Sequence, residues 1–158
     1  IGGRTGTSDP TNIVFAREID ELIDKLDLGD HVHWTGFVDN EQVSGHLLAV
    51  DMVALPYRDG VSFRRGSLMA ALAHGCAIIT TRPEFNTPEL EGDRAARLIP
   101  PDSPTALAVA IEDLAENPDL CAQMSTSARG LAAQFTWDSI ATRTASFFEM
   151  LLATKQTS

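Results

Sequence analysis

Residues 51–81 read DMVALPYRDGVSFRRGSLMAALAHGCAIITT, and this stretch decides the fold. Its first apolar run, residues 52–55, ends at Pro56, as expected for a buried central strand whose carboxyl end opens into a loop. The alanine-rich residues 64–74 are followed by Gly75, which predicts a helix that lies close to the sheet and is capped by glycine. A second apolar run, residues 77–81, completes a strand, helix and strand, the pattern of a parallel sheet.

The same alternation continues toward the amino terminus. Asp39 and Gln42 have the spacing of a capping box, in which each side chain bonds the backbone N–H of the other residue, and this predicts the start of a short helix. The elements expected in this part are a strand ending at Ile1, a turn over residues 2–7, a helix over 12–26, a strand over 31–35 closed by Gly36, and a helix through residue 48.

Toward the carboxyl terminus the pattern becomes helical. We expect a last strand over residues 97–99, a break at two prolines, and helices over 103–116, 118–133 and 138–153, each with an apolar stripe. Trp34 and Trp137 stand among apolar neighbours and are expected to anchor the core. The chain is therefore expected to stay compact to its end.

These elements predict an α/β fold, a parallel sheet with helices on both faces and a helical carboxyl-terminal third. With 158 residues and no repeat or linker, residues 1–158 are expected to form a single domain. The start at Ile1 shows neither an initiator Met nor a signal peptide, so we expect the chain to begin partway through a longer protein.

Composition narrows the possible partners. A net charge of −10 disfavours nucleic acid and anionic lipid, and no apolar run is long enough to cross a bilayer. Cys76 and Cys121 lie far apart, without the spacing of a disulfide framework or a zinc site, which favours a cytoplasmic setting. Anion binding would have to be local, and four arginines crowd into one central segment: Arg58, Arg64, Arg65 and Arg82.

Residues 59–68, DGVSFRRGSL, are the most informative candidate site. In open α/β sheets ligands bind beyond the carboxyl ends of the strands, and here such a loop enters a helix whose amides and dipole attract anions. A diphosphate would accept bonds from the backbone around Gly66 and Ser67 and from Arg64 or Arg65. The alternative is a solvated helix start with Ser62 as its N-cap.

Two further groups are weaker candidates. The turn at Gly2 and Gly3 either approaches a phosphate or is a tight structural turn. Glu84, Asn86 and Glu89 follow the strand over residues 77–81 and either contact a sugar or base or are surface side chains. The four histidines share no spacing with one another or with a carboxylate, and we assign them no chemistry.

Several short motifs in a fixed order identify a family resemblance. They are the runs 51–56 and 72–81, Gly36-Phe37-Val38, Thr87-Pro88-Glu89 and Phe135-Thr136-Trp137-Asp138. Their order and spacing over nearly the whole chain resemble glycosyltransferase family 4, or group 1. The resemblance implies a Rossmann-like sheet that forms the carboxyl-terminal, donor-binding half of a two-domain GT-B enzyme.

This resemblance also implies the reaction. A sugar, of the hexosyl type, would move from a nucleotide diphosphate sugar to an acceptor held by the missing amino-terminal domain, with retention of configuration and without cofactor or metal. The sequence contains no Asp-x-Asp motif, in agreement with a metal-independent reaction. This half should not catalyse transfer alone, and any peripheral membrane contact would come only through the missing domain.

The resemblance and the loop together give a list of expected site residues. The expected catalytic residues are Arg64, Arg65 and Ser62, and the two arginines would stabilise the leaving diphosphate. The donor-binding residues are expected to be Gly2, Gly3, Gly36, Phe37, Gly66, Ser67, Leu68 and Glu89.

Two positions depart from the family. It usually has glutamate where this chain has Ser62 and Ala70, and Ala70 cannot accept bonds from a ribose diol. This departure supports a rival reading, a non-catalytic domain that binds a nucleotide or a partner. A second rival, a dehydrogenase-like enzyme, lacks an acidic residue after a complete GxGxxG turn.

Overall fold

The computed structural model describes residues 10–156, so the predicted strand end at Ile1 and the turn over residues 2–7 lie outside the described residues. The chain divides into two compact units, Ile1–His46 and Leu47–Ser158, which are described separately. Within the described residues, no helix is long and apolar enough to cross a membrane.

The first unit contains one long helix and the start of a second. Helix α1 (Pro10–Lys25) agrees with the predicted range, but its apolar stripe is open, with Phe15 60% exposed. Helix α2 (Asn40–Ala49) begins at the predicted capping box: the Asp39 N–H donates to Gln42 Oε1 at 3.2 Å, and the Gln42 N–H donates to Asp39 Oδ1 at 2.8 Å. The capping box is thus confirmed.

The strand predicted over residues 31–35 is wrong. Residues 31–35 belong to no strand, and Gly36, next to them, forms an isolated bridge. Alternating side chains do not make a strand, because a strand exists only through backbone hydrogen bonds to a neighbour. Trp34 is 55% exposed and does not anchor a core.

The second unit is built on a small parallel sheet of order β1-β2-β3, with β1 (Met52–Leu55), β2 (Ala77–Thr81) and β3 (Arg97–Ile99). All three strands occupy the ranges predicted from the sequence. Strand β1 was predicted to be a buried central strand, but among the described strands it lies at the edge of the sheet and none of its residues is fully buried. Val53 pairs with Ile78, and Thr80 pairs with Leu98. Every residue of β2 is buried, so both faces of this central strand are covered.

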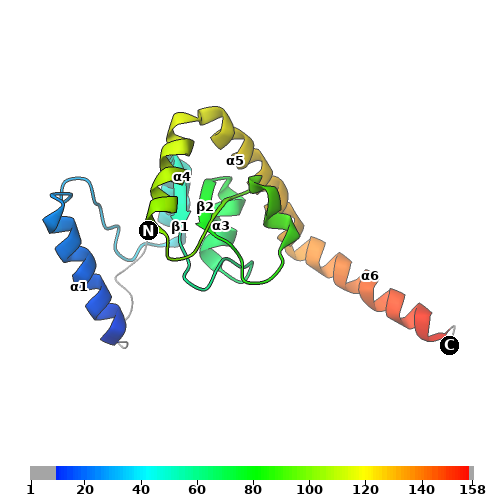
Figure 1. The fold of residues 1–158 in the computed structure, drawn as a ribbon. Helices are drawn as coiled ribbons and strands as arrows, with labels where there is room; N and C mark the ends of the chain where they lie inside the picture. Colours follow the sequence, from blue (N-terminus) through cyan, green and yellow to red (C-terminus); the bar gives the residue numbers. More distant parts are fainter. Residues whose placement is uncertain (1–9, 157–158) are drawn as a thin grey trace. The chain divides into compact units, whose positions relative to one another are not determined.

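The described residues of the second unit also form α-helices and short 3-10 turns around this sheet, and Figure 1 shows the helices. The α-helices are α3 (Gly66–His74), α4 (Pro104–Glu116), α5 (Pro118–Ala132) and α6 (Trp137–Gln156), and the 3-10 turns are η1 (Pro88–Asp93) and η2 (Ala133–Phe135). As predicted, Gly75 ends α3 in the left-handed conformation, with φ of 67°.

The core lies between the sheet and its helices. On one face, Ile79 packs against Leu114 of α4 and Met124 of α5, all at most 1% exposed. Helix α3 packs against β1 and α5 through its buried face, which includes Leu68 and Leu72. The predicted α/β architecture, with helices on a parallel sheet and a helical carboxyl-terminal third, is confirmed.

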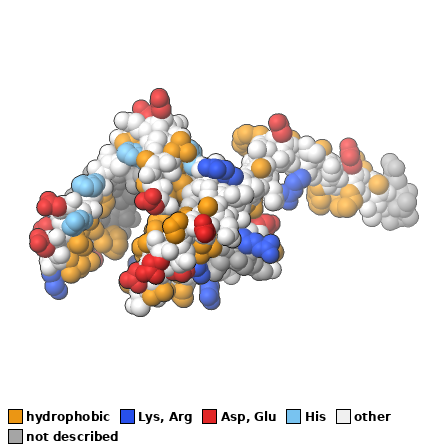
Figure 2. Space-filling model, turned by 90° about the horizontal axis from the view of Figure 1, so that it is seen from above, with side chains coloured by type: hydrophobic (Ala, Val, Ile, Leu, Met, Phe, Trp, Pro, Cys, Tyr) orange, Lys and Arg blue, Asp and Glu red, His pale blue; other side chains and the backbone are white. Residues whose placement is uncertain are grey.

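The last helix departs from the prediction of a chain that is compact to its end. Hydrophobic side chains gather along α6 in the space-filling view, and Phe147 and Phe148 are 52% and 57% exposed (Figure 2). Trp137, at the start of this helix, is 85% exposed instead of buried in the core. An apolar stripe predicts which face of a helix can be buried, but not that a neighbour covers it.

The core assignment predicts that Leu114→Ala lowers the free energy of unfolding by about 2 to 5 kcal/mol, because it removes a buried side chain and leaves a cavity. Val109→Ala is the matched control on the same helix, since Val109 is 59% exposed, and a change within about 0.5 kcal/mol is expected. Urea denaturation followed by circular dichroism measures both. Equal losses in the two variants would contradict this core.

Candidate functional site

The candidate site lies where the parallel strands β1 and β2 end, at the carboxyl edge of the sheet. The residues after Leu55 form a loop that leads into α3, and the residues after Thr81 lead into η1. Because parallel strands share one direction, both loops leave from the same edge. This edge is where ligands bind in open α/β sheets.

Two buried threonines fasten the first loop to β2. The Thr80 hydroxyl donates to the Leu55 carbonyl, and the Thr81 hydroxyl donates to the Tyr57 carbonyl, each at 2.7 Å. Both threonines are at most 1% exposed. The Thr80 hydroxyl thus bonds the last residue of β1, the Thr81 hydroxyl continues the pairing past the end of β1, and together they fix where the loop begins.

Gly60 brings the two loops into backbone contact. Its φ is +77°, and a Cβ atom placed on it would lie 2.6 Å from the Arg82 carbonyl oxygen and 3.0 Å from the Glu84 nitrogen. Only glycine combines this conformation with this close approach. Farther along the loop, the Phe63 ring packs on Phe135 of η2, with ring centroids 4.4 Å apart.

The amino terminus of α3 has no side-chain cap. The helix begins at Gly66, two residues later than predicted, because residues 62–65 form a turn in which the Arg65 N–H donates to the Ser62 carbonyl at 3.0 Å. Arg65, not Ser62, is the N-cap residue, and its side chain makes no capping bond. The alternative reading with Ser62 as N-cap is therefore wrong. The first amides of the helix, at Gly66, Ser67 and Leu68, have no partner within the helix. Gly66 and Ser67 are exposed, whereas Leu68 is fully buried.

Arg65 lies in a cluster of polar and aromatic side chains beside these amides. Its guanidinium forms an ion pair with Asp59 and lies over the Tyr57 ring, with Cζ 4.7 Å from the ring centroid. The Tyr57 hydroxyl and Ser67 Oγ share a hydrogen bond of 2.6 Å. Arg64 is exposed and, within the described part of the chain, forms no ion pair. The structure therefore brings the arginine pair to the amino terminus of α3.

The remaining predicted donor-binding residues come from other parts of the chain. Glu89 is exposed on η1, in the segment that follows β2. Gly36, with φ of +67°, and Phe37, 94% exposed, belong to the first unit. Gly2 and Gly3 lie outside the described residues.

The other two arginines of the central segment are held at the same edge. The Arg82 N–H donates to the Ile99 carbonyl at 2.8 Å, which extends the pairing of β2 with β3, and its side chain is exposed. The Arg58 side chain pairs with Asp102 at 3.2 Å on the surface. Arg82 thus bonds the last residue of β3, and Arg58 pairs with a residue shortly after it.

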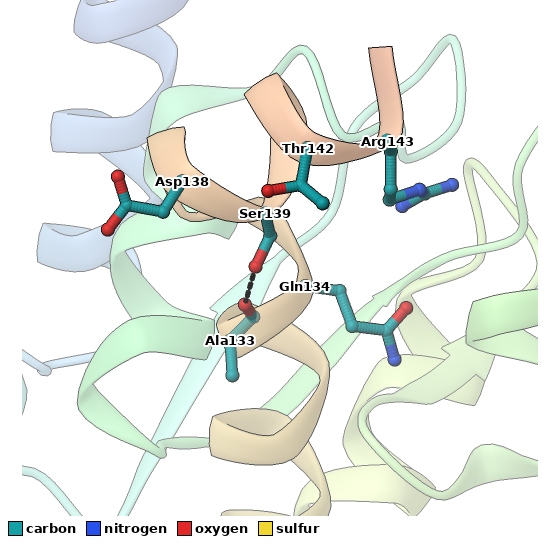
Figure 3. A pocket seen from close by; sticks show the side chains of 6 residues that line it. All are labelled: Ala133, Gln134, Asp138, Ser139, Thr142 and Arg143. Carbon is teal, nitrogen blue, oxygen red and sulfur yellow. Dashed lines mark hydrogen bonds between the residues drawn. The ribbon is translucent and has the colours of Figure 1, made fainter. Parts of the chain in front are cut away.

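A separate hollow of about 600 Å³ lies at the start of α6 and is lined by polar side chains, including Asp138, Thr142 and Arg143 (Figure 3). The Ser139 hydroxyl in this hollow donates to the Ala133 carbonyl at 3.1 Å. Of the described residues that the sequence predicts to bind a ligand, none lines it. Its side chains come from η2 and α6, not from the loops at the carboxyl edge.

Both cysteines line a smaller hollow of about 240 Å³ at the opposite, amino-terminal ends of β1 and β2. Burial raises the pKa of the Cys76 thiol, and the nearby Arg129 charge opposes this shift. The Cys76 thiol donates to the Leu47 carbonyl at 3.4 Å. It is thus a protonated structural group at neutral pH, not a nucleophile. Among residues 10–156, no group of three or more His, Cys, Asp or Glu side chains is placed to hold a metal ion.

Sequence reasoning assigned no role to Tyr57, Asp59 and Thr81, which shape the site. Tyr57 and Asp59 stand between the end of a predicted strand and the arginine pair, and this placement is the signal that could have identified them. Their contacts depend on how the loop folds back, which periodicity does not report. For Thr81 the sequence indicates only the last residue of a strand.

The profile of one protein family, described as glycosyl transferases group 1, matches residues 14–131. This match covers most of the chain, including the loop and all of α3. The chain belongs to the group 1 glycosyl transferases. The family resemblance seen in the sequence is thus confirmed. No curated protein sequence matches the chain significantly.

Solved structures share the fold of this group 1 glycosyl transferase. Sucrose-phosphate synthase from Thermosynechococcus elongatus is 25% identical, with a TM-score of 0.72 over 94% of this chain and 38% of its own. Anabaena HepE in complex with UDP and glucose is 20% identical, with a TM-score of 0.78 over 94% of this chain and 39% of its own. The C-terminal domain of the group 1 protein LpcC from Francisella tularensis is 20% identical, with a TM-score of 0.68 over 80% of this chain and 65% of that domain's chain. The chain therefore spans about two fifths of the first two proteins.

This group 1 glycosyl transferase has no carboxylate at positions 62 and 70, the two departures from the family noted in the sequence. Ser62 is half-buried in the loop, and Ala70 is half-buried in the middle of α3. The exposed Glu84 and Glu89 supply carboxylates in the segment after β2. The polar groups at the amino terminus of α3 are therefore amides, hydroxyls and arginines, with Asp59 as the acidic member of the cluster.

The contact at Gly60 predicts that Gly60→Ala lowers the free energy of unfolding by about 2 to 4 kcal/mol, from a positive φ and a backbone overlap. Gly130→Ala, in α5, is the matched control, because a Cβ atom there meets nothing within 4 Å. That control is expected to gain up to about 1 kcal/mol. Thermal or urea unfolding checks both variants, and a Gly60→Ala protein as stable as the parent would contradict the contact.

Proposed function

We propose that the second unit holds the diphosphate of a nucleotide diphosphate sugar at the amino terminus of α3, as the donor-binding half of a glycosyltransferase. The observation that carries this proposal is the uncapped start of α3, at the carboxyl edge of the sheet, with Arg64 and Arg65 beside it. Backbone amides and the helix dipole favour an anion there, and arginine suits phosphate oxygens.

Structural neighbours support this proposal. Solved structures of Anabaena HepE contain UDP, UDP-glucose, or UDP and glucose, and they share this fold. Because the chain spans only about two fifths of that protein, an acceptor site in a second, amino-terminal domain belongs to the proposal. The proposal also takes residues 1–158 as one nucleotide-sugar-binding domain. It includes sugar transfer with retention of configuration, without metal or cofactor, in a cytoplasmic setting.

Each site residue has a proposed role. The amides of Gly66, Ser67 and Leu68 bind diphosphate oxygens, and the two arginines stabilise the negative charge that develops as the sugar leaves. Preorganised donors of this kind are the largest contribution that such a site offers, because they need no rearrangement during the reaction.

The other site residues are proposed to surround the rest of the donor. Ser62 would lie next to the transferred sugar. Gly2, Gly3, Gly36, Phe37 and Glu89 are proposed as further donor contacts.

A second candidate function is a non-catalytic domain that binds a nucleotide or a partner. Ser62 and Ala70 favour it, because they cannot replace two carboxylates that accept hydroxyl bonds. Hydrolysis or transfer from UDP-glucose, GDP-mannose and ADP-glucose by the full-length protein separates the two candidates. Turnover supports the enzyme, whereas nucleotide binding without turnover supports the binding module.

The proposed site predicts that Arg65→Ala weakens binding of a nucleoside diphosphate by about 1.5 to 3 kcal/mol, because it removes a charge-assisted hydrogen bond. Calorimetric titrations with UDP, GDP and ADP, side by side, measure the loss and identify the base. Arg143→Ala on α6 is the control, an exposed arginine in the hollow of Figure 3, and it should bind like the parent. Unchanged affinity in Arg65→Ala would remove Arg65 from the site.

A further inference from the structure

Asp59 pairs with the guanidinium of Arg65, the group that binds the donor diphosphate in the proposed function. It lies six residues before Arg65, in the same loop, and forms an ion pair with it. The Arg65 side chain is 36% exposed and that of Asp59 is 70% exposed. The carboxylate therefore reaches Arg65 from the solvent side and meets water over most of its surface.

The cluster holds the guanidinium beside the first turn of α3. The Tyr57 ring supports the guanidinium from one face, and the Tyr57 hydroxyl bonds Ser67, the second residue of the helix. The fork of N–H groups on arginine bonds a carboxylate or a phosphate in the same planar geometry. A diphosphate at the helix amides and the Asp59 carboxylate therefore seek the same donors.

We propose that Asp59 is an affinity-setting residue, an internal anion that pairs with Arg65 in the empty site and competes with the donor diphosphate. This inference rests on the proposed function. When the donor binds, Arg65 exchanges the Asp59 carboxylate for a phosphate oxygen, and the carboxylate becomes fully solvated. Because Asp59 is already mostly hydrated, this exchange needs little desolvation. After transfer, the returning carboxylate favours release of the nucleoside diphosphate.

The solvent exposure of the Asp59–Arg65 ion pair determines how much the removal of Asp59 changes nucleoside diphosphate affinity. Ion pairs at exposed positions contribute weakly, so removal of the competitor is expected to tighten nucleoside diphosphate binding by about two- to five-fold. A purely supporting role for Asp59 has the opposite consequence: if the carboxylate only oriented Arg65 toward the ligand, its removal would weaken binding. The sign of the change therefore decides between competition and support.

The test is calorimetric titration of Asp59→Asn with UDP, GDP and ADP, next to the parent protein. Asp59→Glu keeps the charge and should bind like the parent. Asp102→Asn is the matched control, because Asp102 forms a surface pair with Arg58, at 3.2 Å and 66% exposed, and no change is expected. Asp59→Asn leaves Arg65 without its carboxylate, so its affinity should also fall more steeply between about 50 mM and about 500 mM salt.

A double-mutant cycle separates this inference from the proposed function. In Arg65→Ala the competitor has no partner, so adding Asp59→Asn should bring no gain through Arg65. If Arg65→Ala weakens binding while Asp59→Asn leaves it unchanged or weaker, competition by Asp59 is overturned and the proposed function stands. If neither the parent nor any variant binds a nucleoside diphosphate, both are overturned.

Discussion

The close approach of Gly60 to the carbonyl of Arg82 is the constraint on which the candidate site depends. It presses the loop after β1 against the segment after β2, and the Thr81 hydroxyl holds the same loop by the Tyr57 carbonyl. Because these contacts fix the first half of the loop, the chain turns at residues 62–65 and enters α3 at Gly66. The amides of the first helical turn therefore stand at the carboxyl edge of the sheet, and the site is a consequence of backbone packing.

Local charge, not net charge, makes this edge fit for an anion. The chain carries −10 overall, which repels anions at long range, but screening limits this repulsion at physiological salt. At short range, the positive potential of Arg64, Arg65 and the α3 helix dipole outweighs the net negative charge of the chain. Asp59 belongs to this balance, because it neutralises Arg65 in the empty site and keeps the guanidinium in place over Tyr57. The same contacts that order the arginine thus also moderate its affinity.

The sequence predicts the sheet of the second unit well because its signals are local. Apolar runs bounded by Pro56 and Gly75 define β1, α3 and β2, and the Asp39–Gln42 capping box starts α2. Two predictions failed because, within the described residues, no neighbour covers the segment: the strand over residues 31–35 and the burial of Trp137. At the candidate site, the arginine pair was predicted from its residue type and its position, and the structure places it at the amino terminus of α3. The cap at Ser62 was wrong and Asp59 was overlooked, since both depend on how the loop folds back.

The central claim is that the uncapped amides of α3 bind the diphosphate, and amide chemical shifts in a nitrogen-15 NMR titration with UDP, GDP and ADP test it most directly. Hydrogen bonds to phosphate oxygens should move the amide protons of Gly66, Ser67 and Leu68 downfield as the ligand saturates the protein. The Ala106 amide, already capped by Ser103 Oγ at 3.3 Å in α4, should not move. Saturable shifts that leave residues 66–68 unchanged and fall elsewhere, such as around the hollow at the start of α6, would contradict the account.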